Sequence, residues 1–389
     1  MRLALITHRF VKGDGQGRVN YELARAALEA GHTVWLLASA VAPELAAHPG
    51  ARVVHIGTGG LPGSLLQNQA FALGTAFWLW RHRKEVDLVH GNGFVSWGAV
   101  DVSSSHFVHA AWVRNPFHTW RLRRDAYGLY QLLYSLSGRW LERWAYRRAR
   151  CLVAVSEQVR GELVAAGFDT QALHVIPNGV DVAEFAPRHG VRESLGLPAG
   201  RLLLFTGDLK TPRKNLDTLL RAMTRVQGAT LLVAGGLAGS PYPRMAAELG
   251  LAGRVVFLGF RRDVAQLMRS ADIFVFPSRY EACSLVLLEA AASGLPIVTA
   301  RATGGAELLT AECSALLADT EDAARLAEVL NALLADPARL SCMGQAARRV
   351  ALQNSWDVMC GRYLELYREL LEQGSDEASA GAGTGHAVS

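Results

Sequence analysis

Two glutamates in the second half of the chain, Glu281 and Glu289, have a spacing that could place both on one ligand. Glu281 lies in a polar loop after the apolar run 273–276, which we expect to be a buried strand. Glu289 lies within 285–292, which we expect to be a helix, and residues 297–298 open the next strand. The stretch therefore predicts a strand, a loop, a helix and a strand, with one carboxylate on the loop and one on the helix.

The two carboxylates are expected to do different work. Ligands of open α/β sheets bind at the carboxyl ends of strands, where Glu281 lies. Ser284, Leu285 and Val286 begin the helix, and their free N–H groups suit a phosphate. Glu289, about one turn further in, can accept hydrogen bonds from a ribose diol. Ribose, diphosphate and a polyhydroxyl group beyond it together describe a nucleotide-sugar.

This stretch resembles the E-x7-E motif of the retaining GT-B glycosyltransferases, the group 1 or family 4 class. Glu281, seven residues and Glu289 are followed by Ala-Ala-Ala-Ser-Gly-Leu-Pro. The resemblance implies an α/β fold of the GT-B type, with two Rossmann-like domains facing each other across a cleft. It also implies that Glu281 orients the sugar. A helix glutamate solvated on an exposed face would show the same spacing, so the surrounding motifs must decide.

A second motif follows the expected strand 202–206. By resemblance, Lys214 is the cation on the donor diphosphate, where it can neutralise charge on the leaving phosphate. Family members commonly carry Arg directly after the glycine, but this chain has Asp208, which we expect to turn away from the diphosphate. Lys210 or Arg213 would then supply the second positive charge.

The first residues of the chain form a βαβ pattern with a glycine-rich first loop. The strand 3–7 is followed by Gly15 and Gly17 and then by a helix over 19–30. Glycine lets the backbone approach a ligand closely at a helix start. A glycine-rich turn without a ligand would look the same. In the family that the chain resembles, this loop faces the donor diphosphate, which makes both glycines donor-binding.

Two further positions are assigned by the resemblance. A half-polar strand carries His106 at its end, where the family has a His that points at the donor sugar. His109 is the alternative, and a purely structural histidine is the other interpretation. No further Cys or carboxylate cluster completes a metal site around the pair. Phe260 ends the expected strand 255–260, in the region that holds the base.

Residues 112–150 have the most unusual composition, with nine Arg and four Trp against two acids, Asp125 and Glu142. A basic amphipathic helix with aromatics can lie on an anionic membrane surface, each cation contributing about 1 kcal/mol. It can also hold an anionic acceptor. A helical pair with aromatics packed inward and Arg in water is the alternative. No known nucleic-acid-binding motif supports a nucleic-acid partner.

The length of 389 residues predicts two domains. The run Val-Ile-Pro-Asn-Gly-Val-Asp, followed by Phe185, resembles the end of the family's first domain, and the linker is placed near 182–200. We therefore expect an acceptor-side domain over 1–185 and a donor-binding domain over 200–355. A terminal helix over 356–373 is expected to cross back to the first domain, and 374–389 are expected to be a disordered tail.

The net charge of +5 suits anionic partners without requiring nucleic acid. The five cysteines are scattered without a C-x-x-C spacing, which predicts reduced thiols in the cytoplasm. The first residues are expected to form a strand rather than a signal peptide, and no apolar run approaches the roughly 20 residues of a membrane span. We therefore expect a cytoplasmic protein, with peripheral binding to the inner face of the membrane as an option.

By resemblance, the chain is a hexosyltransferase that moves a sugar from a nucleoside-diphosphate-sugar to a glycan or lipid-linked acceptor. Cell-surface polysaccharide or glycolipid synthesis is the expected setting. The resemblance also implies that transfer proceeds with retention, without a bound metal and without a cofactor other than the donor. The alternatives are a catalytically silent nucleotide-sugar-binding subunit, which only Asp208 supports, and a dinucleotide-dependent dehydrogenase. The incomplete glycine fingerprint and the two glutamates argue against the latter.

Overall fold

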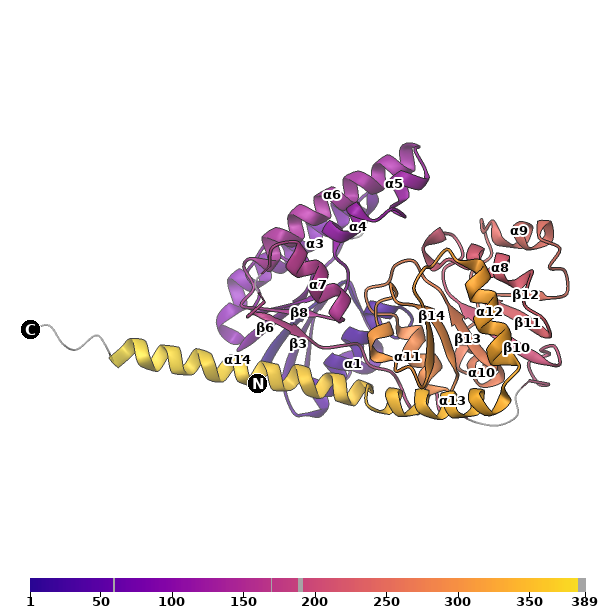
Figure 1. Cartoon of the computed structure of the whole chain (residues 1–389). Helices are drawn as coiled ribbons and strands as arrows, with labels where there is room; N and C mark the ends of the chain where they lie inside the picture. Colours follow the sequence, from indigo (N-terminus) through magenta and orange to yellow (C-terminus); the bar gives the residue numbers. More distant parts are fainter. Residues whose placement is uncertain (59, 169, 188–191, 384–389) are drawn as a thin grey trace, which may run out of the picture. The chain divides into compact units, whose positions relative to one another are not determined.

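The computed structural model describes residues 1–58, 60–168, 170–187 and 192–383. The chain divides into two compact units (Figure 1). Unit 1 comprises Met1–Val155, Val159–Ile176 and the chain from Trp356 onward, and unit 2 comprises Ser156–Gln158 and Pro177–Ser355. Each unit has its own parallel sheet with helices around it, so both are Rossmann-like and the α/β prediction is confirmed.

Unit 1 contains a seven-stranded parallel sheet in the order β5-β3-β1-β6-β7-β8-β9. Its strands are β1 (Arg2–Ile6), β3 (Thr33–Ala38), β5 (Ala51–His55), β6 (Leu88–Asn92), β7 (Val102–Ser105), β8 (Cys151–Ala154) and β9 (Leu173–Val175). A small separate ladder pairs β2 (Arg9–Phe10) with β4 (Ala40–Val41). The helices that accompany this unit are α1 (Gly15–Glu29), α2 (Pro43–Ala46), α3 (Gly63–His82), α4 (His109–Arg114), α5 (Thr119–Leu122), α6 (Ala126–Tyr146), α7 (Glu157–Ala165) and α14 (Trp356–Gly383), with the 3₁₀ turn η1 (Arg83–Glu85).

Unit 2 contains a six-stranded parallel sheet in the order β12-β11-β10-β13-β14-β15. Its strands are β10 (Arg201–Thr206), β11 (Ala229–Ala234), β12 (Val255–Gly259), β13 (Ile273–Phe276), β14 (Ile297–Ala300) and β15 (Ser314–Leu317). Its helices are α8 (Leu216–Met223), α9 (Tyr242–Glu248), α10 (Val264–Ser270), α11 (Leu285–Ala292), α12 (Ala323–Leu334) and α13 (Pro337–Leu352), with 3₁₀ turns η2 (Pro212–Lys214) and η3 (Ala306–Leu308).

The hydrophobic cores explain why these segments are strands. All four residues of β13 are fully buried, and the central strand β10 is buried from Leu202 onward. Strands buried on both faces need continuous apolar runs rather than alternation, which is the pattern that the sequence shows. In both sheets the strand order reverses between two central neighbours, β1 and β6 in unit 1 and β10 and β13 in unit 2. Such switch points are where open α/β sheets bind ligands.

The division between the units falls earlier than the predicted boundary at 185. Val180 and Phe185 belong to the hydrophobic core of unit 2. Val180 also pairs with Ser355, and its N–H donates to the carbonyl of Asn354 at 3.0 Å. The segment after Ile176 therefore packs with the second unit, because its apolar side chains find their partners there. Of the predicted linker, residues 188–191 lie outside the described residues.

Helix α14 is part of unit 1. His90 on β6 contacts the hydroxyl of Tyr367 through Nδ1 at 2.6 Å and Ser104 Oγ through Nε2 at 2.8 Å. Ser104 Oγ also contacts the hydroxyl of Tyr363 at 3.0 Å. These buried contacts attach the terminal helix to the sheet. The backbone helix extends beyond the predicted end at residue 373, into a stretch that contains the strong helix formers Glu and Ala.

The basic segment 112–150 folds mainly into α4, α5 and the long helix α6. Within the residues that the structure describes, no helix combines the length and the apolar character needed to cross a membrane.

The buried imidazole of His90 should make folding stability depend on pH. Burial lowers the pKa of His90 from 6.5 to about 3, so the unfolded chain binds a proton that the folded chain does not. Stability should therefore fall as the pH drops below 6.5, by about 1.4 kcal/mol per pH unit from this group. In His90→Gln, the loss of unfolding free energy between about pH 7.5 and about pH 5 should be smaller by about 2 kcal/mol, measured by urea denaturation.

His55→Gln, at an exposed position on β5, is the matched control. A His90→Gln protein whose stability falls as steeply with pH as that of the wild type would contradict this prediction.

Candidate active site

The loops after β10 and β13 bring two of the predicted catalytic residues together. Lys214 ends the 3₁₀ turn η2, and Glu281 lies in the loop that follows β13. Lys214 Nζ is 2.6 Å from Glu281 Oε1, and Ser278 Oγ donates to the same carboxylate oxygen at 3.0 Å. The predicted diphosphate-binding cation and the predicted sugar-orienting carboxylate therefore form an ion pair at the switch point of unit 2.

The side chain of Lys214 is only 15% exposed. Burial lowers the pKa of Lys214, while the carboxylate of Glu281 acts in the opposite direction. The nitrogen also lies 5.2 Å from the centre of the Phe276 ring, which adds a cation–π contact. A cation that has given up most of its water can interact strongly with an incoming anion, because fewer water molecules must be removed.

Arg279 holds the two loops in place, a role that no sequence motif indicated. Its side chain is 4% exposed and donates to both carboxylate oxygens of Asp217, at 2.9 Å each. It also donates to both oxygens of Glu321, at 2.7 and 2.6 Å, and to the carbonyl of Pro212 at 2.6 Å. Its own N–H bonds the carbonyl of Arg213 at 2.9 Å. We call this arrangement the Arg279 clamp.

The start of α11 offers fewer open amides than predicted. The N–H of Ser284 already donates to the carbonyl of Gly304 at 2.9 Å, so it is not available to a phosphate. Leu285 and Val286 N–H groups have no backbone acceptor among the described residues, as expected for a helix start. Glu289 is half-buried one turn further along the same helix.

The Gly304 backbone comes so close to this loop that its carbonyl accepts the N–H of Ser284. A Cβ at Gly304 would lie 2.2 Å from the carbonyl oxygen of Ala282 and 2.3 Å from that of Glu281, so only glycine fits. The Thr303-Gly-Gly run could have indicated this packing, because paired glycines after a strand often mark a close backbone approach. Only the tertiary structure, however, shows that this run packs against the loop 281–284.

Asp208, which stands where the family commonly has an arginine, forms hydrogen bonds within its own loop. Asp208 is exposed and accepts hydrogen bonds from the N–H of Lys210 at 3.0 Å and from Thr211 Oγ1 at 3.4 Å. Its carboxylate thus stabilises its own loop. Arg213 is half-buried and forms no ion pair within the described part of the chain, which leaves its charge available. Phe260, directly after β12, is 75% exposed.

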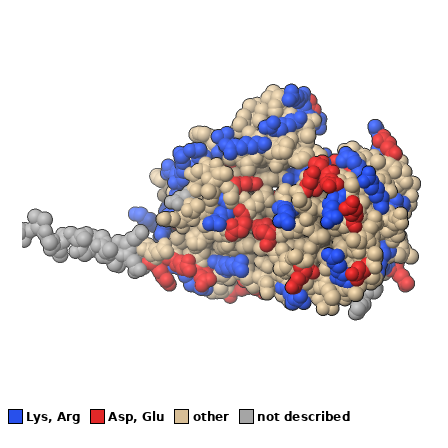
Figure 2. All heavy atoms as spheres, in the orientation of Figure 1, with Lys and Arg blue, Asp and Glu red and all other residues tan. Residues whose placement is uncertain are grey.

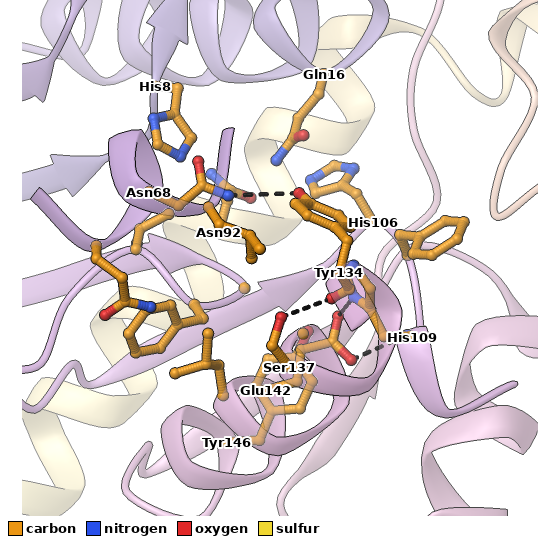
Figure 3. A pocket seen from close by; sticks show the side chains of 18 residues that line it. His8, Gln16, Asn68, Asn92, His106, His109, Tyr134, Ser137, Glu142 and Tyr146 are labelled. Carbon is orange, nitrogen blue, oxygen red and sulfur yellow. Dashed lines mark hydrogen bonds and ion pairs between the residues drawn. The ribbon is translucent and has the colours of Figure 1, made fainter. Parts of the chain in front are cut away.

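Unit 1 contains a cavity of about 230 Å³ at the carboxyl ends of β1, β6 and β7 (Figure 3). We call it the unit 1 pocket. The predicted His106 lies in it together with the alternative, His109. Among its other polar lining residues are His8, Gln16, Asn68 and Asn92. Burial lowers the pKa of His106 to about 4 and also lowers that of His8, so both imidazoles are neutral at pH 7.

The predicted glycine pair lies at the start of α1. Asp14 caps this helix, and its carboxylate accepts the N–H of Gly17 at 3.0 Å. A Cβ at Gly17 would lie 3.0 Å from both Asp14 Oδ2 and the carbonyl of Val11. Gly17 is therefore needed for the cap, and its amide is already used by Asp14. Gly15 is the first residue of the helix.

His109 has a partner that the sequence did not reveal. Its Nδ1 is 2.5 Å from Glu142 Oε1, although the two residues lie on different helices, α4 and α6. Across the described ranges, no group of three or more His, Cys, Asp or Glu side chains comes together in a way that could hold a metal ion.

Comparison with known proteins connects this geometry to a family. The model for "Glycosyltransferase Family 4" matches residues 13–184, and that for "Glycosyl transferases group 1" matches residues 200–336. A D-inositol 3-phosphate glycosyltransferase of Xylanimonas cellulosilytica is 30% identical over 396 residues, covering 92% of this chain and 92% of that protein. The Mycobacterium tuberculosis protein of the same name is 34% identical over 237 residues, covering 57% of this chain and 49% of that protein.

Solved structures share the fold. Sucrose-phosphate synthase from Thermosynechococcus elongatus aligns with a TM-score of 0.76 at 23% identity, covering 96% of this chain and 99% of that one. WaaG, a glycosyltransferase involved in lipopolysaccharide biosynthesis, aligns with a TM-score of 0.74 at 20% identity, covering 94% and 99%. Anabaena HepE in complex with UDP-glucose aligns with a TM-score of 0.69 at 19% identity, covering 95% and 100%. From its sequence relatives and its fold, the chain belongs to the group 1, or family 4, glycosyltransferases of the GT-B type.

Proposed function

We propose that this glycosyltransferase moves a hexosyl group, with retention, from a nucleoside-diphosphate-sugar to a glycan or lipid-linked acceptor. The observation that carries the proposal is the buried Lys214–Glu281 pair at the switch point of unit 2. Glu289 follows on α11, and the helix begins with two open amides. This set matches a sugar, a diphosphate and a ribose in that order.

Each group of the donor has an assigned partner in this proposal. Lys214 and the N–H groups of Leu285 and Val286 bind the diphosphate, with Arg213 as the second positive charge. Glu289 accepts hydrogen bonds from the ribose hydroxyls, and the exposed ring of Phe260 contacts the base. We also assign Glu281 and His106 to contacts with the sugar. Gly15 and Gly17 are assigned to the diphosphate.

The proposed reaction needs no base from the protein. The acceptor hydroxyl attacks the anomeric carbon from the face that the diphosphate leaves, and the departing phosphate oxygen takes the hydroxyl proton. The bond from the sugar to the phosphate oxygen breaks, and its electron pair stays on the phosphate. Lys214 and the amides of α11 stabilise that charge, so the proposal assigns no role to a bound metal ion or cofactor.

The comparisons support the proposed substrates in different degrees. HepE has been solved with UDP and with UDP-glucose, which supports a nucleotide-sugar donor. WaaG is described as involved in lipopolysaccharide biosynthesis, which supports an acceptor in cell-surface glycan synthesis. The name of the sequence relatives raises inositol 3-phosphate as a candidate acceptor.

We further propose that unit 1 binds the cytoplasmic face of an anionic membrane through α3, α5 and α6. Helices α3 and α6 are neighbours, because Ser64 Oγ lies 2.7 Å from the hydroxyl of Tyr130 and Asn68 Nδ2 donates to that of Tyr134 at 3.4 Å. Each helix exposes large apolar side chains at helical spacing: Leu66, Leu73, Phe77 and Trp80 on α3, and Leu129, Leu133, Leu136 and Trp140 on α6. Exposed apolar rows of this kind mark interaction surfaces.

Positive charge accompanies the apolar rows. On the face drawn in Figure 2, Lys and Arg side chains gather over the region of α5 and α6, with few acidic side chains. Arg114, Arg139 and Arg143 line a cavity of about 250 Å³ beside α6. None of the three forms an ion pair within the described residues. Unpaired arginines next to exposed aromatics suit anionic lipid headgroups.

The Arg279 clamp fixes the position of the loop that carries Lys214 relative to the loop that carries Glu281. It connects Pro212 and Asp217, on either side of Lys214, with the loop that carries Glu281. A small shift of either loop would separate Lys214 from the position of the diphosphate. We therefore assign Arg279 a positioning role.

Glu289→Ala should weaken donor binding. Ribose hydroxyls that lose a charged acceptor cost about 1.5–3 kcal/mol, which corresponds to about 10- to 100-fold in affinity. Calorimetry with UDP-, GDP- and ADP-sugars would measure the effect and identify the base. Glu328→Ala, at an exposed position on α12, is the control. Donor affinity that is unchanged in Glu289→Ala would contradict the assignment of the ribose site.

Arg279→Gln should destabilise unit 2 strongly. It removes the charged hydrogen bonds that Arg279 donates to Asp217 and Glu321, and bonds of this kind contribute about 1.5–3 kcal/mol to the free energy of unfolding. Arg221→Gln is a matched control, because Arg221 also pairs with Asp217, at 3.3 Å, but is half exposed. Exposed pairs contribute less than about 1 kcal/mol. Denaturant titration would measure both, and equal losses in the two variants would show that the clamp has no special role.

Replacing Arg139, Arg143 and Arg147 with Gln should weaken binding to phosphatidylserine vesicles. Three cations at about 1 kcal/mol each predict a loss of about 100-fold at low salt, measured by vesicle sedimentation. The control replaces three exposed arginines of unit 2, Arg225, Arg262 and Arg339, with the same change of charge. If both triple variants bind alike, the proposed membrane surface is wrong.

A further inference from the structure

Asn215, the residue directly after Lys214, has a backbone conformation that is rare outside glycine. Its φ is 61° and its ψ is 36°, and no other non-glycine residue in the described chain has a positive φ. This left-handed turn lies between the 3₁₀ turn η2, which ends at Lys214, and helix α8. Asn tolerates the left-handed region better than most residues, but less well than glycine. The turn sets the direction in which the chain leaves Lys214.

The usual reason for an Asn at the start of a helix does not apply to Asn215. An N-cap Asn accepts an N–H group of the first helical turn through its side-chain oxygen. Asn215 makes no such bond to α8, and its Oδ1 has no donor within the described residues. The side chain is nevertheless fully buried. A buried acceptor without a donor is unfavourable, so another interaction must account for this residue.

That interaction is made by the amide nitrogen. Nδ2 of Asn215 donates to the carbonyl of Pro277 at 2.9 Å and to that of Thr320 at 2.6 Å. Both acceptors are backbone carbonyls, which cannot donate, so the orientation of the amide is fixed. Pro277 directly follows β13, and Thr320 lies beyond β15. One side chain therefore joins the turn after Lys214 to two segments that are distant in sequence.

The position of Lys214 depends on the segments that this amide connects. The carbon stem of Lys214 passes close to Gly207, because a Cβ built there would lie 3.5 Å from its Cγ. Its Nζ lies 5.2 Å from the centre of the Phe276 ring, at the end of β13, and 2.6 Å from Glu281 Oε1. Phe276 directly precedes the carbonyl that the amide binds. The amide thus fixes the end of β13 against the turn that carries the lysine.

Two unfavourable features coincide at Asn215, the left-handed backbone and the unpaired buried oxygen. Features of this kind persist where the surrounding structure requires them, and they are frequent at functional sites. Glycine would adopt the same turn without strain and would leave no oxygen unpaired. What Asn adds over glycine is the pair of hydrogen bonds from its nitrogen.

We propose that Asn215 is a positioning residue for sugar transfer, whose left-handed turn and two hydrogen bonds hold the Lys214 ammonium beside Glu281. The inference rests on the proposed function, which assigns Lys214 to the departing diphosphate. Asn215 acts through the lysine and not on the donor, since its own side chain is fully buried. Charge accumulates on the phosphate as the sugar leaves, so a displaced Lys214 should slow turnover more than it weakens donor binding.

Nuclear magnetic resonance on the full chain can follow Lys214 directly. The chain has four lysines, at positions 12, 84, 210 and 214, so isotope-labelled lysine gives few signals. Burial lowers the pKa of Lys214, and the carboxylate of Glu281 acts in the opposite direction. In Asn215→Gly, the ammonium should move into water, and its pKa should rise toward the ordinary value of a lysine. Titration of the ε-carbon signals measures this shift.

Asn331→Gly is the matched control. Asn331 on α12 also bonds two backbone groups of unit 2, the N–H of Gln227 and the carbonyl of Arg225, at 3.1 Å each. This variant should leave the titration of Lys214 unchanged. Asn215→Ser, whose hydroxyl has one proton for two carbonyls, should shift the titration in the same direction as Asn215→Gly, and it serves if the glycine variant is poorly folded. A Lys214 signal that titrates as in the wild type in both Asn215 variants, or that shifts equally in Asn331→Gly, would overturn the proposal.

Kinetics test whether Asn215 acts through Lys214. The wild type is given UDP-, GDP- and ADP-glucose, and the donor that it hydrolyses fastest is used for the variants. Asn215→Gly should lower kcat by about 10-fold and change KM less, because stabilisation of the leaving charge is lost. In Lys214→Ala, the same substitution should change kcat by less than about two-fold, because the effects of coupled residues do not add. Equal effects in the two backgrounds would contradict a role through the lysine.

The two measurements separate this inference from the proposed function. A wild type that hydrolyses none of the donors, or a Lys214→Ala variant with unchanged turnover, would contradict the proposed function. The titration would then still decide whether Asn215 holds Lys214 in place. Turnover that depends on Lys214 together with an unchanged titration in the Asn215 variants would contradict only the role of Asn215.

Discussion

The donor-binding edge of unit 2 depends on one buried guanidinium. Removing an arginine from water is costly, so Arg279 must satisfy its donors within the protein. It does so with the carbonyl of Pro212 and with Asp217, which lie on one stretch around Lys214, and with Glu321, which lies far along the chain. The same requirement brings the turn that ends at Lys214 next to the loop that carries Glu281. The short Lys214–Glu281 contact is therefore a consequence of the clamp as much as of the attraction between its own two charges.

The two switch points share a topology and differ in chemistry. In unit 2, a buried lysine, an arginine with no ion pair among the described residues and two helix amides collect positive character, which suits a diphosphate. In unit 1, the neutral imidazoles of His106 and His8 line the pocket together with an amide oxygen that has no donor among the described residues, and none of the described lining residues is Lys or Arg. Parallel sheets place ligands at the same kind of edge, but the side chains on the loops decide what binds there.

Much of the fold could be predicted from sequence. Strands such as 273–276 are continuous apolar runs, because both faces of a parallel sheet are buried. The boundary at 185 was placed too late, because Val180 and Phe185 are apolar in either unit and only packing assigns them to unit 2. The amide of Ser284 was predicted to be open, but it already donates to Gly304. Gly17 was predicted to let the backbone approach a ligand, but its own N–H donates to Asp14. Asp14 is close in sequence to Gly17 and could have been recognised as a helix cap.

The sequence by itself determined the two α/β units, the glutamate pair on a strand–loop–helix stretch and the resemblance that assigned Lys214 and His106. These depend on local spacing, which hydrophobic periodicity and short motifs record directly. Only the tertiary structure decided the partners of the buried polar groups. Asp217 and Glu321 are far in sequence from Arg279, and Glu142 is far from His109. A buried charge must find its counterpart wherever the chain folds back, and no local pattern specifies where that is.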